Sequence, residues 1–276
     1  MTLVLQKLGI IAGGGGLPLQ IANACIARGQ PCFVLAVEEL ASQVPPHVPS
    51  MRNPLSKLGR AFATLRRNAC RDVVFAGQFE RPVGPIRFRP DLAALWFFVR
   101  RLGSFRRGDD STHRIVAGEF ERAGFRVVSP LDADPDLAAP RGYLSRKQQD
   151  SAASEDMLQA LRQAQSHGRS DEGQAVVVRG GIVIAREGRG GTDAMLAKLA
   201  RAANRGGVLA KAMKPGQTRQ IDPPAIGEST VAAAAAAGLD GIVVEAGATV
   251  VVDKDAVAAA ADRLGLFVYG LETAGA

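Results

Sequence analysis

Short apolar runs alternate with amphipathic stretches through the first half of the chain. Four apolar runs are typical of buried strands, over residues 8–12, 32–37, 72–76 and 125–128. Helical spacing of apolar residues lies between them, over 17–27, 58–69, 91–102 and 109–123. A strand, a helix and a further strand in this rhythm require crossover connections and therefore parallel pairing. The pattern predicts an N-terminal Rossmann-like domain with a parallel sheet over residues 1–130.

The periodicity is lost over residues 131–150, where Pro, Asp, Ala, Arg and Gln dominate, as is typical of a linker. Regular patterns then resume with a helix over 150–165 and a hairpin over 174–185. We expect further helices over 192–202, 228–237 and 255–264, and further strands over 208–212, 242–244, 249–252 and 266–269. The chain therefore belongs to the α/β class, with a second, mixed α/β domain over residues 151–276.

Composition excludes several classes of protein. The three cysteines have no paired spacing and the three histidines are scattered, which excludes a disulfide scaffold, a zinc ribbon and a His-rich metal site. The apolar runs are too short to cross a bilayer and no signal-peptide pattern is found, so we expect a cytoplasmic protein. The net charge of +7 suits an anionic partner, but with 5% aromatic residues and no recognition motif we expect no nucleic acid.

A glycine-rich loop, Gly13–Gly16, joins the first expected strand to the first helix. Glycines there let backbone N–H groups approach a phosphate at the positive end of the helix dipole. Glu38 or Glu39 ends the next strand, where a dinucleotide-binding domain has its ribose-binding acid. Pro18 replaces the third glycine of that fingerprint. The loop predicts an anion or nucleotide site, and a tight turn that binds nothing is the alternative.

Two further segments of the first half carry arginines. Gly77–Pro82 follows the third strand, where Arg81 either pairs with a phosphate or is a solvated side chain in a turn. The apolar stretch Ala93–Val99 precedes four arginines, at 100, 101, 106 and 107. Such a helix either touches lipid at a membrane surface or packs into the core. Asp109, which starts the next helix, is by default an N-cap.

The most informative segment lies in the second half. Lys211, Lys214 and Arg219 fall within nine residues, with Asp222 just beyond them and prolines directly after it. Cations neutralise charge on a transferring phosphoryl group, and a carboxylate holds Mg²⁺ or positions water. A structural ion-pair loop is the alternative. Nearby acids that are candidates for a carboxylate cluster are Glu187, Asp193, Glu228 and Glu245.

Motifs of this kind occur along nearly the whole chain. The segments concerned are Leu8–Gly15 with Leu17-Pro18, Gly77–Pro82, Gly108–Asp110, Glu187-Gly188, Gly191–Leu196, Lys211–Gly227, Gly238–Ile242, Glu245–Gly247 and Gly265–Phe267. Together they resemble the metal-dependent UDP-2,3-diacylglucosamine pyrophosphatases of lipid A biosynthesis, the LpxI family. The resemblance implies two α/β domains joined by a linker, and hydrolysis of the substrate to lipid X (2,3-diacylglucosamine 1-phosphate) and UMP with Mg²⁺ (or Mn²⁺). Gln78 stands where the family usually has Asn, and Pro223 and Ala225 replace Leu and Thr.

On this resemblance and the residues together we assign roles. The expected catalytic residues are Asp222, Lys211, Lys214 and Arg219. Substrate is expected to contact Gly13, Gly14, Gly15, Leu17, Gln78, Arg81, Asp109, Asp110, Thr192, Asp193 and Gly227. The expected metal ligands are Asp222, Asp193 and Glu245. The expected partners are the glycolipid UDP-sugar and the acidic surface of the inner membrane, with peripheral association there, and we also consider a homodimer.

Two other classes of function stay open from the sequence. One is an NAD(P)-binding Rossmann oxidoreductase that uses Gly13, Gly15 and Glu38. The other is a non-catalytic nucleotide- or lipid-binding protein, which would bind the UDP-sugar lipid without metal-dependent release of UMP.

Overall fold

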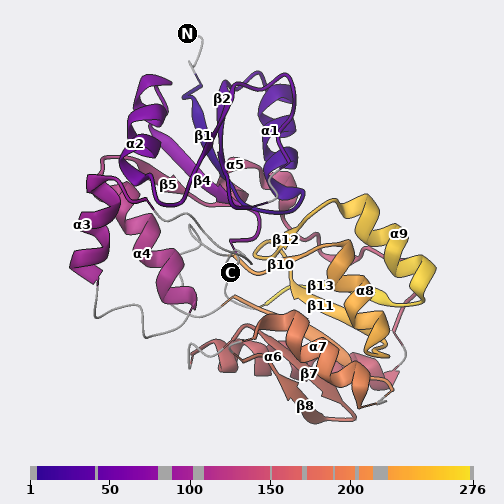
Figure 1. Ribbon diagram of the computed structural model, residues 1–276. Coiled ribbons are helices and arrows are strands. Elements are labelled where there is room, and N and C mark those ends of the chain that lie inside the picture. The colour runs from indigo at the N-terminus through magenta and orange to yellow at the C-terminus, as the bar shows by residue number, and fades with distance from the viewer. Residues whose placement is uncertain are drawn as a thin grey trace. The chain divides into compact units, whose positions relative to one another are not determined.

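The computed structural model describes residues 5–40, 43–79, 89–101, 109–149, 151–169, 173–188, 190–202, 205–213 and 223–273. The chain divides into two compact units, residues 1–135 and 136–276. Each unit has its own sheet (Figure 1). Among the described residues, no helix is both long and apolar enough to cross a bilayer.

The first unit is built on a five-stranded sheet in which every neighbouring pair is parallel, with the order β3-β2-β1-β4-β5. Its strands are β1 (Leu8–Ala12), β2 (Cys32–Val37), β3 (Ser50–Asn53), β4 (Asp72–Ala76) and β5 (Arg126–Val128). Every residue of β1 and β2 is buried, as expected where helices cover both faces of a parallel sheet. The predicted Rossmann-like parallel sheet is confirmed.

The helices of the first unit are α1 (Leu17–Ala27), α2 (Leu58–Arg67), α3 (Leu92–Arg101), α4 (Asp109–Arg122) and α5 (Pro130–Ala133). Figure 1 shows α1 on one face of the sheet and α2 and α4 on the other. The helices lie on two faces because of the strand order. The chain moves from β1 toward β3 on one side of the sheet and toward β5 on the other, and right-handed crossovers in opposite directions place their helices on opposite faces. The point where the order reverses lies between β1 and β4, and ligands of such sheets bind at the carboxyl ends of strands flanking this point.

The second unit contains a six-stranded mixed sheet with the order β6-β13-β11-β9-β7-β8. Its strands are β6 (Gly142–Tyr143), β7 (Ala175–Arg179), β8 (Ile182–Arg186), β9 (Val208–Lys211), β11 (Gly241–Glu245) and β13 (Phe267–Leu271). The three central strands β9, β11 and β13 are parallel, whereas β6, β7 and β8 run antiparallel to their neighbours. A separate parallel pair joins β10 (Ala225–Ile226) to β12 (Val250–Val251).

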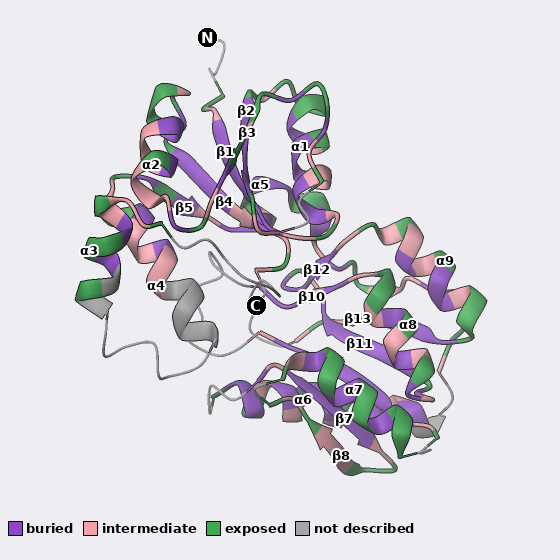
Figure 2. Cartoon of the chain, in the orientation of Figure 1, coloured by how far each residue is buried: buried purple, intermediate pink, exposed green. Residues whose placement is uncertain are grey.

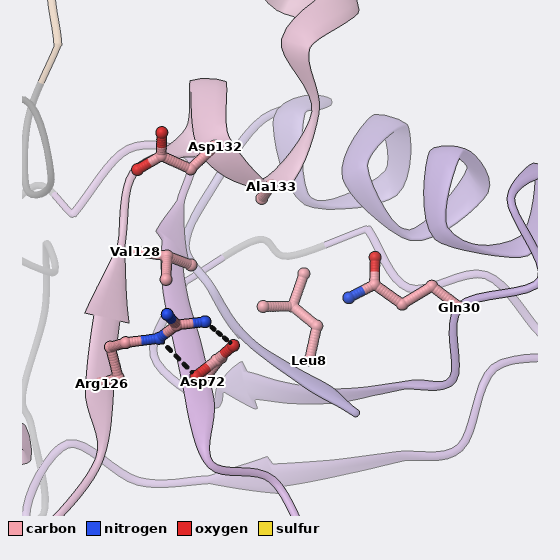
Figure 3. A pocket seen from close by; sticks show the side chains of 7 residues that line it. All are labelled: Leu8, Gln30, Asp72, Arg126, Val128, Asp132 and Ala133. Carbon is pink, nitrogen blue, oxygen red and sulfur yellow. Dashed lines mark hydrogen bonds and ion pairs between the residues drawn. The ribbon is translucent and has the colours of Figure 1, made fainter. Parts of the chain in front are cut away.

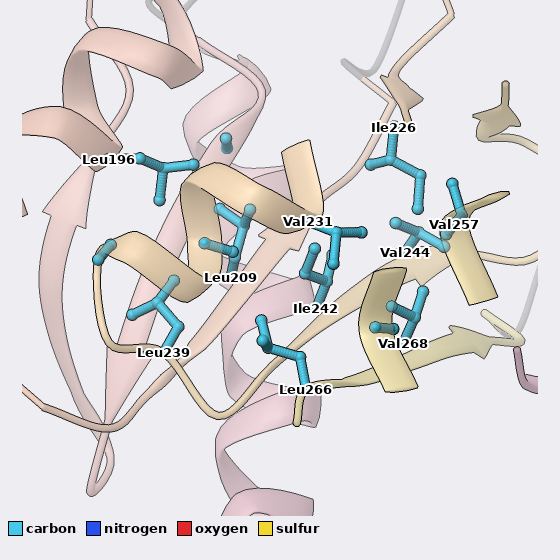
Figure 4. Close-up of a cluster of buried hydrophobic side chains, with 14 of the residues drawn as sticks. Leu196, Leu209, Ile226, Val231, Leu239, Ile242, Val244, Val257, Leu266 and Val268 are labelled. Atoms are coloured by element: carbon cyan, nitrogen blue, oxygen red, sulfur yellow. The ribbon is translucent and has the colours of Figure 1, made fainter. Parts of the chain in front are cut away.

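Two buried clusters hold this sheet between helix layers. On one face α6 (Ser151–Arg169) packs against Val176, Val178 and Val208. On the other face, α7 (Gly191–Arg201), α8 (Glu228–Ala236) and α9 (Lys254–Leu264) cover Val177, Leu209 and Ile242 (Figure 4). Alternate residues of β7 thus pack against opposite helix layers, α6 on one face and α7, α8 and α9 on the other, as the pleat of a strand requires. The expectation of a mixed α/β second domain is confirmed.

Residues 131–150, which the sequence analysis assigned to a linker, contain short ordered elements up to residue 149. They include most of α5, a 3₁₀ turn (Pro135–Leu137) and the edge strand β6. The backbone N–H of Ala139 donates to the carbonyl of Thr249, and that of Leu144 donates to Val268. This stretch is therefore hydrogen-bonded to the second unit from Ala139 onward.

Candidate active site

The glycine-rich loop after β1 is hydrogen-bonded to the loop after β4. The N–H of Gly14 donates to the carbonyl of Gln78 at 2.8 Å, and the N–H of Gln78 donates back to Gly14 at 2.9 Å. The N–H of Gly13 also donates to Ala76 at 2.8 Å. The two loops that the sequence singled out are therefore one paired structure at the carboxyl ends of the strands beside the switch point.

This pairing explains two of the glycines. A Cβ on Gly13 would lie 2.5 Å from the carbonyl oxygen of Gln78. Gly77 has φ +96° and its Cβ would clash with the carbonyl oxygen of Gly14. Both glycines are thus required by the contact between the loops. Gly15 differs, because it has φ +83° but open space around it, which leaves room for a ligand.

The start of α1 is the part of this loop suited to an anion. Its N-cap residue, Gly16, makes no side-chain cap hydrogen bond. The first N–H groups of a helix have no partner within the helix and carry a partial positive charge. Leu17 is buried with 8% exposure, so its side chain belongs to the core.

The other predicted contacts of the first unit are placed only in part. Gln78 is exposed. Arg81 lies outside the described residues. Asp109 and Asp110 begin α4, and their side chains lie outside what the structure describes.

The acids that suggested a dinucleotide site have different surroundings. Glu38, directly after β2, is exposed. Both carboxylate oxygens of Glu39 accept a hydrogen bond from the backbone N–H of Leu55, at 3.1 and 3.0 Å. Glu39 therefore has a structural role, holding the chain that follows β3.

In the second unit, Glu245 gathers three segments at the carboxyl end of β11. One oxygen accepts hydrogen bonds from Thr273 Oγ1 at 2.7 Å and from Gln165 Nε2 at 3.4 Å. The other accepts from the backbone N–H of Met213 at 3.3 Å. Glu245 is 9% exposed, so these donors replace water around a buried carboxylate. The side chain holds the ends of α6, β9 and β13 together.

Lys211 ends β9, the strand beside β11, and is also buried. Its Nζ donates to the carbonyl of Ala225 at 3.0 Å. Ala225 is the first residue of β10, the first strand after the cationic segment. The ammonium of Lys211 therefore links the end of β9, before the cationic segment, to the start of β10, after it.

Lys214, Arg219 and Asp222 lie outside the described residues, within the stretch 214–222. The two ends of this stretch are described. On one side Met213 is bound by Glu245, and the N–H of Ala212 donates to Gln174 at 3.1 Å. On the other side Pro224 is buried, and its carbonyl accepts from the N–H of Val250 at 2.8 Å. The stretch thus begins at the carboxyl end of a central parallel strand, where α/β sheets bind ligands.

The second glycine-rich loop is organised by Glu187. One of its carboxylate oxygens accepts from the N–H of Gln174 at 2.8 Å, and the other accepts from the hydroxyl of Thr192 at 3.2 Å. His167 Nε2 lies 2.6 Å from the carbonyl oxygen of Glu187. Thr192, a predicted substrate contact, is therefore buried and bound to a neighbouring side chain. Asp193, the next residue, is exposed in the first turn of α7.

Gly227 directly precedes α8 as its N-cap. Its N–H donates to Thr230 Oγ1 at 3.3 Å and its carbonyl accepts from Val231 at 3.2 Å. It lies five residues after Asp222, so the helix dipole of α8 begins close in sequence to the predicted catalytic acid.

A metal centre cannot be assembled from the described side chains alone. Among them, no group of three or more His, Cys, Asp or Glu residues is placed to hold an ion. Two of the predicted ligands differ in their surroundings, since Asp193 is exposed and Glu245 accepts hydrogen bonds from three donors. The third, Asp222, lies outside the described residues.

A cavity of about 250 Å³ lies elsewhere, at the amino ends of β1, β4 and β5 (Figure 3). Leu8, Asp72 and Arg126, which begin these three strands, line it. The guanidinium of Arg126 binds both oxygens of Asp72, with Nε 2.8 Å from Oδ1, and this pairing raises the pKa of Arg126. The cavity is thus on the edge of the sheet opposite the glycine-rich loop and contains none of the predicted site residues.

Thr273, Gln165 and Gln174 were not singled out from the sequence. Each becomes part of the site only through a partner distant along the chain, such as Glu245, which is 80 residues from Gln165. One sequence signal was available for Thr273, because it follows the last expected strand as a polar residue. For the two glutamines we find no local signal.

Comparisons with known proteins find one family model for each of the two units. Residues 7–137 match the family model of the LpxI N-terminal domain, and residues 140–269 match that of the LpxI C-terminal domain. A curated relative, UDP-2,3-diacylglucosamine pyrophosphatase LpxI from Caulobacter vibrioides, is 40% identical over 97% of this chain and 98% of its own length. The two family models together cover most of the chain, and the relative is matched over nearly its full length. The chain belongs to the LpxI family.

Proposed function

We propose that this protein hydrolyses the pyrophosphate bond of UDP-2,3-diacylglucosamine. Water attacks one phosphorus, the bond from that phosphorus to the bridging oxygen breaks, and the products are 2,3-diacylglucosamine 1-phosphate (lipid X) and UMP. The observation that carries the proposal is the 40% identity, over 97% of the chain, to a relative named for this pyrophosphatase activity. The activity belongs to lipid A biosynthesis.

The proposed catalytic group is the carboxylate of Asp222, aided by the cations Lys211, Lys214 and Arg219. Support comes from the described ends of the stretch 214–222, which Glu245 and Lys211 hold at the carboxyl end of β9. These hydrogen bonds fix where the chain enters the stretch and where it leaves it. Cations placed there stabilise the negative charge that develops on the pyrophosphate.

Mg²⁺, or Mn²⁺ in its place, is the proposed cofactor. Mg²⁺ usually keeps several waters and binds through one or two carboxylates together with substrate phosphates. We propose that Asp222 supplies the main protein ligand, while Asp193 and Glu245 remain the other predicted ligands. The ion would polarise the phosphoryl oxygens.

The proposed substrate contacts in the first unit are the glycine-rich loop and Arg81. Gly15 has open space, and the first turn of α1 has no side-chain cap, so backbone N–H groups are suited to a phosphate of the UDP moiety. Gln78 lies on the loop bound to Gly14 and is exposed. Asp109, Asp110, Thr192 and Gly227 remain predicted contacts.

The deciding experiment follows UMP and sugar phosphate by phosphorus NMR, with UDP-2,3-diacylglucosamine in detergent micelles. We expect release of both products with Mg²⁺ or Mn²⁺ and none with a chelator. Asp222→Ala should bind substrate and keep its thermal unfolding midpoint but lose turnover. A matched control, Asp255→Ala, removes an exposed acid from the first turn of α9 and should stay fully active. Full activity of Asp222→Ala, or turnover that survives the chelator, would contradict the assignment.

A further inference from the structure

The helix α3 presents a row of large apolar side chains to the outside. Leu92, Leu95, Trp96 and Val99 are 85%, 50%, 62% and 53% exposed. Their spacing of three, four and seven residues places them on one face of the helix. We call these four residues the α3 stripe. In the described part of the chain ten large apolar side chains are exposed, and four of them form this stripe.

The opposite face and the start of α3 attach the helix to its unit. Ala94 and Phe97 are buried, and Figure 2 shows both exposed and buried positions along α3. Asp91 accepts the N–H of Ala94 at 2.9 Å through one oxygen and the N–H of Arg60, in α2, at 3.1 Å through the other. The helix therefore already has a core-facing side. The core interpretation of the sequence thus holds for one side of the helix, and the stripe is a second apolar face outside the core.

The charges near the α3 stripe in the sequence indicate which kind of partner it binds. Residues 87–107 include six arginines, at 87, 89, 100, 101, 106 and 107, and a single acid, Asp91. Both oxygens of that acid already accept backbone hydrogen bonds. An apolar helix face flanked by cations complements a surface with an apolar interior and anionic head groups. Tryptophan is favoured at such an interface.

A second copy of the chain suits the stripe less well. A twofold dimer would place α3 of one copy, with the six arginines near it in the sequence, against α3 of the other. The resulting repulsion opposes the gain from apolar contact. We therefore propose that the α3 stripe docks the protein onto the surface of an anionic phospholipid bilayer. This location would give access to an acylated substrate, a consequence that rests on the proposed function.

The test uses vesicles without substrate. The full-length protein is sedimented with vesicles of phosphatidylcholine alone or of phosphatidylcholine with phosphatidylglycerol, at low and high salt. Trp96 is the only tryptophan of the chain, so its emission reports on the stripe directly. We expect at least tenfold stronger partitioning onto the anionic vesicles at low salt, a shift of the emission to shorter wavelength, and weaker binding at high salt.

Two double variants test the residues. Leu92→Glu/Leu95→Glu should lower the partition coefficient at least tenfold, and the milder Leu92→Ser/Leu95→Ser should lower it in the same direction. The control Leu158→Glu/Ile182→Glu changes two exposed apolar side chains of the second unit and should bind vesicles within twofold of the wild type. Circular dichroism confirms that each variant is folded.

Vesicle binding that is unchanged in both stripe variants, or wild-type binding without an emission shift, would overturn the proposal. Self-association that depends on the stripe, with no binding to vesicles, would also overturn it in favour of a second copy. Failure of the proposed function is seen separately, because UMP release is measured in detergent micelles and vesicle binding needs no turnover.

Discussion

The carboxylate of Glu245 binds the backbone N–H of Met213, the last described residue before the stretch that carries Lys214, Arg219 and Asp222. Glu245 ends β11, and Met213 lies two residues after the end of the adjacent parallel strand β9. Glu245 therefore fixes where this stretch leaves the sheet. Its effect on catalysis is expected to come from positioning as much as from any contact with an ion.

Glu245→Gln tests this positioning. A glutamine has one acceptor oxygen, so it cannot serve the donors on both sides, and its NH₂ group would face an N–H or a hydroxyl. A buried donor left without an acceptor costs about 1–3 kcal/mol, which we expect as the fall in the free energy of unfolding in urea. Turnover should fall roughly tenfold to a hundredfold because the stretch loses its place.

The matched control for this variant is Glu272→Gln. Glu272 is exposed and pairs with Arg141 at 2.9 Å, and an exposed pair contributes about 0–1 kcal/mol. Its stability and turnover should stay close to those of the wild type. If Glu245→Gln were equally stable and active, the positioning role would be wrong.

Lys211→Met separates two roles of a buried cation. Methionine keeps a similar length but removes the donor to the carbonyl of Ala225, so the free energy of unfolding should fall by about 1–3 kcal/mol. If Lys211 also stabilises charge on the pyrophosphate, kcat should fall by about 10²–10³. Lys198→Met, an exposed position on α7, provides the control. A loss of stability with unchanged kcat would limit Lys211 to holding β10.

Gly77→Ala tests the pairing of the two loops of the first unit. The new Cβ would clash with the carbonyl oxygen of Gly14, at a residue with φ +96°. Overpacking together with a left-handed backbone should cost about 2–4 kcal/mol in the free energy of unfolding. Gly29→Ala is the control, with φ +65° but open space, and should cost about 1 kcal/mol. Equal losses in both variants would show that the loops are not in contact.

The thiol of Cys70 gives a dependence on pH. Burial raises the pKa of Cys70 to about 11. A thiol whose pKa is higher in the folded state than in the unfolded state stabilises the fold below the unfolded pKa, and this contribution is lost as pH rises toward 11. Between pH 7.5 and 10, the free energy of unfolding should therefore fall more for the wild type than for Cys70→Ala. An identical fall in both proteins would show that this thiol does not contribute.

Long apolar runs predicted the fold well because burial on both faces leaves a clear signal in the sequence. The runs at 8–12, 32–37 and 72–76 match β1, β2 and β4 at both ends. The strand β3 (Ser50–Asn53) was missed, since it is a polar edge strand that only pairs with β2. Parallel order followed from the crossovers. The expected strand over 249–252 contains β12, whereas its partner β10 was missed because it is only two residues long.

The candidate site was predictable in residue types but not in contacts. Gly13 suggested a ligand, yet its lack of a side chain is needed for contact with Gln78, 65 residues further on. Thr192 suggested a substrate contact, and its hydroxyl donates a hydrogen bond to Glu187. In both cases a contact within the fold uses the property that a ligand would use, namely the missing side chain of Gly13 and the hydroxyl of Thr192. One sequence cannot distinguish these uses, because the partner is brought close only by the fold.

The anchors at Met213 and Ala225 are made by residues outside the stretch between them. Substitutions within 214–222 should therefore leave these two hydrogen bonds, and the sheet beside them, in place. The side chains of the stretch and the hydrogen bonds that fix its ends are thus contributed by separate residues.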